Sequence, residues 1–157
     1  MHKISFLAGL LLVVVGLSSC SKKDREVGDM KTRESGLQYQ FFRLGEEQQP
    51  DSSQLLVMHM TATTATDSVL FDTRTQGFPM ALPANDPNMK GMMAEGIKLL
   101  HKGDSAQFVI PAKDFYLQTA SVPVPQGIDE NGNLKFNIGV VEVTDENGYR
   151  EMQMEFS

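Results

Sequence analysis

The chain has 157 residues, of which 41% are hydrophobic and 22% charged, and this balance excludes wholesale disorder and a multi-span membrane protein. Its formal net charge of -6 argues against nucleic acid as a partner, because duplex binding requires a basic face. Cys20 is the only cysteine, so an intramolecular disulfide is excluded. The sequence therefore predicts one compact domain that is held together by its core.

The first twenty residues have the three parts of a bacterial export signal. A basic start precedes an apolar run over residues 4–17, which is short for a membrane-spanning helix. The sequence LSSC that ends at Cys20 resembles a lipobox. We therefore expect a signal peptide over residues 1–19 and lipidation of Cys20, whose acyl chains would anchor the protein in a membrane. An ordinary signal peptide with a chance cysteine, or a retained anchor helix, is the alternative.

Residues 20–34 follow as a polar, charged segment with few large apolar side chains. This composition is typical of a flexible tether between an anchor and a domain. Charged residues just after a lipidated cysteine also resemble surface-sorting signals of some Gram-negative lipoproteins. The predicted location is the bacterial cell envelope, with the protein anchored in the outer membrane. The sequence allows either the periplasmic side or the cell surface.

The rest of the chain has short apolar or alternating segments separated by turn residues, which predict an antiparallel sheet. The segment 54–63 is apolar on both faces, as expected of a central strand. Asn131-Gly132 predicts a hairpin-type turn before the last strand. The predicted strands span residues 35–45, 54–63, 68–72, 104–110 and 134–140.

One short helix is predicted over residues 92–101, where Met93, Ile97 and Leu100 fall on one stripe. Gly103 is its expected stop and His101 an expected cation near its end.

Pro79, Pro83 and Pro87 predict an irregular, exposed connection before this helix. Residues 145–157 show no clear period, so they are expected to form either a C-terminal extension or an edge hairpin. The predicted fold class is therefore α+β.

Several segments match motifs of the FKBP-type peptidyl-prolyl cis-trans isomerase family at the family's spacing. VMHMT at 57–61 resembles its Val-His-Tyr-Thr strand, and LFD at 70–72 resembles its Phe-Asp strand end. GFPMAL at 77–82 is similar to Gly-x-Pro-Phe-x-Phe. EGI at 95–97, followed by VIP at 109–111, forms the most specific block.

The resemblance covers residues 35–144, from SGLQY at 35–39 to LKFNI at 134–138. It implies an FKBP-like half-open antiparallel β-sheet wrapped over one short α-helix, which agrees with the strand pattern. The implied organisation is a signal peptide over residues 1–19, a lipidated cysteine and tether over 20–34, the domain over 35–144 and the segment 145–157.

The resemblance also assigns four catalytic positions. Phe71 would pack on the proline ring, and Asp72 would polarise or orient the carbonyl side. Tyr116 would donate a hydrogen bond to the substrate backbone, and Phe136 would line the wall.

Other pocket positions depart from the family. Met60, Met80 and Met93 stand where the family has tyrosine, phenylalanine and tryptophan. Because methionine is apolar but less rigid than an aromatic ring, we expect reduced activity or an unusual substrate. Core filling is the alternative role for these methionines. The expected substrate-binding residues are Met60, Met80, Met89, Lys90, Met93 and Ile128.

Rotation about an X-Pro bond needs no nucleophile, metal or cofactor, so none is expected. The first hypothesis is an isomerase that helps exported envelope proteins to fold, with proline-containing segments as partners. The second is a non-catalytic binding or chaperone module with the same fold on the membrane surface. His59 is expected to be structural, and residues 129–133 are expected to form a turn rather than a calcium loop.

Overall fold

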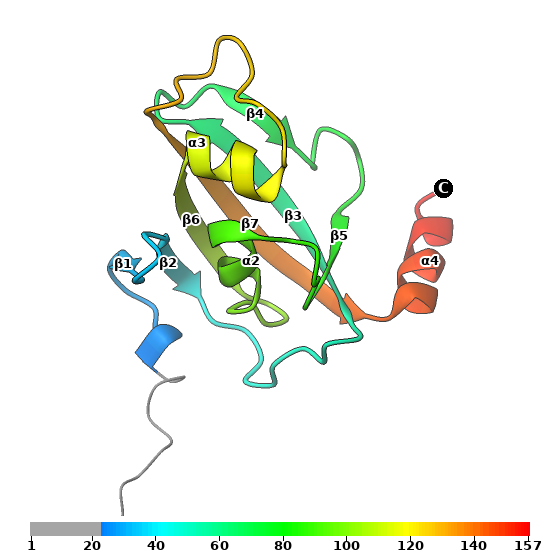
Figure 1. Ribbon diagram of the computed structural model, residues 1–157. Helices are drawn as coiled ribbons and strands as arrows, with labels where there is room; N and C mark the ends of the chain where they lie inside the picture. Colours follow the sequence, from blue (N-terminus) through cyan, green and yellow to red (C-terminus); the bar gives the residue numbers. More distant parts are fainter. Residues whose placement is uncertain (1–22) are drawn as a thin grey trace, which may run out of the picture.

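The structure is a computed structural model, and it describes residues 23–157 (Figure 1). The predicted signal peptide and Cys20 lie outside the described residues. Over residues 23–157, no helix has the length and apolar character needed to cross a bilayer.

Within residues 23–157, seven strands form one sheet with the order β1-β2-β6-β7-β3-β4, and the neighbouring strands are antiparallel. The seventh strand, β5, pairs with the first half of β3, and β4 pairs with the second half of β3 along the same edge. This agrees with the predicted fold class. The strands are β1 (Lys31–Thr32), β2 (Gln38–Arg43), β3 (Leu55–Thr64), β4 (Val69–Asp72), β5 (Met80–Pro83), β6 (Ser105–Pro111) and β7 (Asn133–Thr144).

The centre of the sheet follows directly from the apolar pattern. β3 pairs with β7 along its whole length, so it is central, as predicted. On β7, Leu134, Phe136, Ile138 and Val140 are buried and alternate with more exposed residues. This alternation places one face of the sheet in the core and leaves the other toward solvent.

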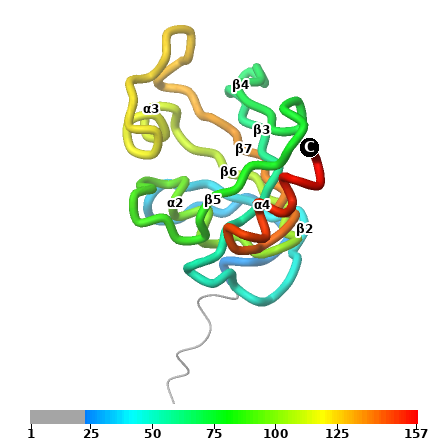
Figure 2. Tube along the Cα trace, turned by 90° about the vertical axis from the view of Figure 1, so that its right-hand side faces the viewer, coloured from blue at the N-terminus to red at the C-terminus, as the bar shows by residue number. Residues whose placement is uncertain are grey.

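Helical segments cover the core face of this sheet. These are α2 (Gly91–Ile97) and α3 (Ala112–Asp114), which continues into the five-residue π-helix η1 (Phe115–Thr119). Figure 2 shows α2 and α3 on the same side of the sheet. The helix α4 (Glu146–Glu155) lies near the C-terminus.

The helix α2 is shorter than predicted. The N–H groups of Leu99 and Leu100 donate to carbonyls only three residues back, at 3.0 and 3.1 Å, so the chain leaves the α-helix in a tighter turn. Gly103 does not stop the helix, because its N–H donates to the Val140 carbonyl across the sheet. His101 is buried, and its ring Nδ1 lies 2.8 Å from the Glu46 carbonyl, so it is not the expected helix-end cation.

The connection around Pro79 and Pro83 is more regular than predicted, because it contains β5. This strand pairs only with β3, from Leu55↔Pro83 to Met58↔Met80. An edge strand tolerates proline, since the missing N–H can face away from the partner strand.

The connection from β6 to β7 also differs from the prediction, which had only a proline-containing loop there. It includes α3 and η1 before a turn in which the Gly132 N–H donates to the Asp129 carbonyl at 3.0 Å. The predicted turn before β7 is therefore present, but it does not join two adjacent strands directly.

The segment 145–157 contains α4 and does not form an edge hairpin. Asp145 caps the helix by accepting a hydrogen bond from the Gly148 N–H at 2.8 Å. Glu146 in the first turn adds a favourable charge there.

The expectation of a flexible tether over residues 20–34 is wrong from Arg25 onward. Val27 bridges Phe41, and β1 pairs with β2. The guanidinium of Arg25 donates to both oxygens of the Asp104 carboxylate, at 2.5 and 3.2 Å. Asp104 is fully buried, and a buried carboxylate requires such partners. The domain therefore includes residues 25–34 of the predicted tether.

Candidate functional site

The predicted pair Phe71-Asp72 lies at the end of β4, opposite Ala62 and Thr61 of β3. Phe71 is half-buried and packs against the core. The carboxylate of Asp72 accepts a hydrogen bond from the Arg74 N–H at 2.9 Å. The turn after β4 therefore holds the Asp72 side chain in place.

Thr73 fixes this strand end to its neighbour, and the sequence reasoning did not single it out. Its N–H donates to the Met60 carbonyl at 3.1 Å, and its hydroxyl oxygen accepts from the Met60 N–H at 3.0 Å. The same hydroxyl lies 3.1 Å from Nδ1 of His59, which is therefore a satisfied structural histidine, as expected. Thr73 is 1% exposed, so these bonds are shielded from water. The only sequence signal is a hydroxyl residue directly after the Phe-Asp strand end.

The helix α2 approaches the sheet closely because Gly96 has no side chain. A Cβ there would lie 2.6 Å from the Phe108 ring of β6. This contact explains why glycine follows Glu95 in the motif that the sequence analysis singled out. It also sets Met93, 3% exposed, deep in the core.

The π-helix η1 carries two neighbouring aromatic rings. The ring of Phe115 lies 4.8 Å from that of Phe136 on β7 and 5.3 Å from that of Tyr116. Tyr116 therefore reaches the predicted wall through Phe115, a residue that the sequence reasoning did not place in the site.

A contact between η1 and the start of α2 fixes Lys90. The Thr119 hydroxyl donates to the Lys90 carbonyl at 2.8 Å. Gly91 follows with φ +79, and a Cβ there would lie 3.1 Å from the Gln118 side chain. The close approach of these two segments therefore depends on glycine at this position.

Most of the predicted residues belong to the hydrophobic core or pack against it, and we call this set the site cluster. Three of its members are almost fully buried and five are half-buried, so the latter five offer the surface that a ligand could contact. Lys90 is exposed, and Asp72 lies at the edge with Phe71. The buried members are Met60, Met93 and Phe136, and the half-buried members are Phe71, Met80, Met89, Tyr116 and Ile128.

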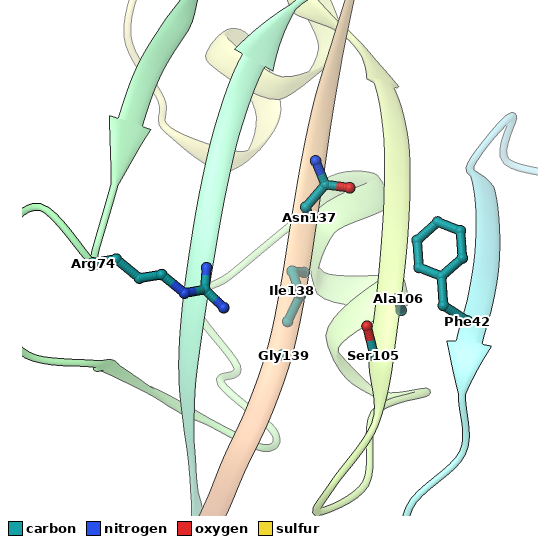
Figure 3. A pocket seen from close by; sticks show the side chains of 7 residues that line it. All are labelled: Phe42, Arg74, Ser105, Ala106, Asn137, Ile138 and Gly139. Carbon is teal, nitrogen blue, oxygen red and sulfur yellow. The ribbon is translucent and has the colours of Figure 1, made fainter.

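A separate hollow lies on the opposite face of the sheet (Figure 3). It has a volume of about 160 Å³, and Phe42, Arg74 and Asn137 are among its lining residues. It contains none of the predicted site residues.

Comparison with known proteins decides the family. A sequence model of the FKBP-type peptidyl-prolyl cis-trans isomerases matches residues 46–141, which are 96 of the 157 residues. The chain belongs to this family. The matched range includes every predicted catalytic and substrate-binding residue, and it excludes β1, β2 and α4.

Two family members show similarity over most of this chain. The FKBP-type isomerase FkpA of Aeromonas hydrophila is 30% identical over 115 residues, which are 73% of this chain and 40% of that protein. The probable FkpA of Neisseria meningitidis serogroup B is 26% identical over 122 residues, which are 78% of this chain and 43% of that protein. The chain thus spans about two fifths of the length of these relatives.

Solved structures agree on the FKBP fold. FkpA from Escherichia coli superposes with a TM-score of 0.60 at 28% identity, over 80% of this chain and 56% of that one. A peptidyl-prolyl isomerase from Pseudomonas syringae superposes with a TM-score of 0.58 at 14% identity, over 80% of this chain and 88% of that one. The second likeness concerns the fold alone.

Proposed function

We propose that this FKBP-family chain catalyses cis-trans isomerisation of X-Pro bonds at the site cluster. The observation that carries the proposal is that Phe71, Met80 and Tyr116, from three separate segments, are each half-buried and pack against the core, with Asp72 next to Phe71 at the strand end. An apolar surface with one carboxylate at its edge suits a proline ring with a polar amide beside it.

The chemistry requires little more than this surface. Resonance in the amide opposes rotation with a barrier of roughly 18–20 kcal/mol, and the twisted amide loses charge separation. An apolar environment that binds the twisted form better than the planar one lowers the barrier. Phe71 would hold the proline ring, Tyr116 would donate to the backbone, and Phe136 would support the wall from below.

The pocket departs from the family at Met60, Met80 and Met93, so we propose reduced activity or an unusual substrate. Met60 and Met93 are 6% and 3% exposed, which limits their direct contact with a ligand. Met80 is half-buried and is therefore the substitution that would most directly alter substrate contact.

The test is a protease-free isomerisation assay on short X-Pro peptides, with the chain lacking residues 1–20. We expect activity above the uncatalysed rate, a loss of tenfold or more in Phe71→Ala, and smaller losses in Asp72→Ala and Tyr116→Phe. Phe42→Ala is the matched control, because Phe42 is 50% exposed on the opposite face. No activity with any X residue, or equal loss in both phenylalanine variants, would overturn the proposal.

A second candidate is a non-catalytic module that binds unfolded chains at the same surface. Two observations favour it: the Asp72 carboxylate is engaged by its own turn, and Met60 and Met93 fill the core rather than a pocket. An inactive chain that still binds a proline-containing peptide, in a manner lost in Phe71→Ala, would establish this alternative.

We also propose that the protein is an envelope lipoprotein, anchored through Cys20, whose clients are exported proteins. The sequence LSSC at Cys20 supports this placement. Cys20→Ser should abolish incorporation of labelled palmitate and move the protein out of the outer-membrane fraction. Protease digestion of intact cells then distinguishes surface display from the periplasmic side. Unchanged labelling in Cys20→Ser would contradict the anchor.

A further inference from the structure

The helix α4 packs against the segment that leads into β5. The ring of Phe78 lies 5.7 Å from that of Tyr149 and 5.4 Å from that of Phe156, so two aromatic residues from the end of the chain contact it. Figures 1 and 2 both show β5 between α2 and α4. The α4 side of this contact lies outside the range that the family model matches, because that range ends at residue 141.

A hydrogen bond extends the same contact to the residue before Met80. The hydroxyl of Tyr149 donates to the Pro79 carbonyl at 3.3 Å. The position of Tyr149 is fixed in turn, because its N–H donates to the carbonyl of the capping residue Asp145 at 3.0 Å. The start of α4 is thus connected through two hydrogen bonds to the residue that precedes β5.

β5 is held by β3 along its length and by the core, against which Met80 and Leu82 pack. It has four residues, pairs only with β3, and ends at a proline, which has no N–H to donate. The residue before it, Pro79, also lacks an N–H. α4 adds to this support at the residues that lead into the strand, Phe78 and Pro79.

We propose that Tyr149 is a positioning residue for the proposed isomerase site: through Pro79 and Phe78 it holds β5 so that Met80 faces the proline. This inference rests on the proposed function. It adds that the C-terminal helix supports the strand that carries Met80. Tyr149 does not touch the substrate. Its effect passes through the backbone at Pro79.

The first experiment compares Tyr149→Phe with Glu151→Ala in the full chain in detergent solution. Tyr149→Phe keeps the ring beside Phe78 and removes the hydroxyl, whereas Glu151 is exposed on the same helix. We expect Tyr149→Phe to raise KM for an X-Pro peptide about two- to fivefold with kcat unchanged, because Met80 contributes to binding. Glu151→Ala should change neither constant. A fall in kcat at constant KM, as from a loss of folded protein, would overturn the proposal.

The second experiment does not depend on activity. In protein labelled at the methionine methyl groups, Met80→Leu assigns the Met80 signal and Met93→Leu the Met93 signal. We expect Tyr149→Phe to shift or broaden the Met80 signal and to leave Met93 unchanged, because Met93 lies on α2. An unchanged Met80 signal would overturn the positioning role. A shifted Met80 signal in an inactive chain would support placement of Met80 by α4 and would overturn the proposed function.

Discussion

Thr73, which is not part of a recognised motif, holds the end of β4 against β3. Replacing Thr73 with valine keeps its shape but leaves the Met60 N–H without its acceptor. We expect Thr73→Val to lower the free energy of unfolding by about 1–3 kcal/mol, the cost of a buried unsatisfied donor. Urea denaturation measures this. Thr63→Val is the control, because it makes the same change at a half-buried position of β3, the strand that carries Met60. Equal losses in the two variants would contradict the role of Thr73.

Met80 is the residue at which the proposed alteration of the pocket can be tested directly. It is half-buried on the site cluster, so Met80→Phe can add a rigid ring without entering the deep core. An aromatic contact contributes about 0.5–1.5 kcal/mol, so we expect kcat/KM to rise about two- to tenfold. Peptide isomerisation kinetics provide the measurement. Met30→Phe, at a 39% exposed position before β1, should have no effect. A lower kcat/KM in Met80→Phe would count against the proposed contact.

His101 should make stability depend on pH. Burial lowers its pKa, with the nearby Arg25 acting in the same direction, whereas the hydrogen bond to the Glu46 carbonyl and the Asp104 charge oppose the shift. Below about pH 6.5 the unfolded chain therefore binds a proton that the folded chain does not. The stabilisation from neutral His101 is complete above that pH and is lost as the pH falls through the folded pKa.

We therefore expect the free energy of unfolding to fall between about pH 7 and 5, and to fall less in His101→Gln. Glutamine keeps a donor for the Glu46 carbonyl but does not titrate. Urea denaturation at several pH values tests this. Parallel curves for the two proteins would show that His101 is not the group responsible.

Motif residues could be predicted at this scale, but the residues that support them could not. The strand end at Phe71-Asp72 follows from local sequence and from the family resemblance. Thr73 and Phe115 act through partners 13 and 21 residues away, Met60 and Phe136. Nothing in the local pattern near either residue reveals such a partner.

Among the elements, the sheet could be predicted and the irregular helices could not. β3 and β7 have long apolar or alternating patterns that are typical of strands. α4 begins with Asn147-Gly148 in its first turn, a poor helix sequence, and is stabilised by packing on Phe78 instead. β5 forms between two prolines because it needs only one partner strand.

The close contact of α2 with β6 gives a test at this scale. Gly96→Ala places a Cβ 2.6 Å from the Phe108 ring, which is fully buried and cannot move aside freely. Overpacking costs about 1–3 kcal/mol, and it outweighs the gain of up to about 1 kcal/mol in helix propensity. Thermal unfolding should show a lower midpoint. Gly139→Ala should be neutral, because its Cβ would meet nothing within 4 Å. A stabilised Gly96→Ala would show that the helix moves away from the sheet without cost.

For the whole molecule, the apolar face of the sheet, α2 and η1 together account for a fold that the sequence predicted in outline. The extent of the domain was harder to predict. Residues 25–34 are polar, which is typical of a tether, yet their contacts with the domain are largely polar as well. Asp104 accepts hydrogen bonds from Arg25, from the Gly45 N–H and from the His101 N–H. Because Arg25 and its partner Asp104 are 79 residues apart in the sequence, their contact leaves no periodic pattern near residue 25.

This attachment predicts the pattern of limited proteolysis. Trypsin must take an arginine or lysine side chain into its specificity pocket, but the side chain of Arg25 is 14% exposed and bound to Asp104. Lys31 lies in β1, and Arg33 forms ion pairs with Asp24 and Glu95. Brief digestion of the native protein, followed by mass spectrometry, should therefore yield no early cut after Arg25, Lys31 or Arg33.

Removing the buried carboxylate should change that pattern. In Asp104→Ala the guanidinium of Arg25 loses its partner, so we expect early cleavage after Arg25 and a loss of about 3–5 kcal/mol in unfolding free energy. Asp29→Ala, at an exposed position in the same segment, is the control and should digest like the native protein. The digestions are compared without urea, at a low temperature at which both variants remain folded. Early cleavage after Arg25 in the native protein would mean that residues 25–34 detach from the domain in solution and act as the tether that their composition suggests.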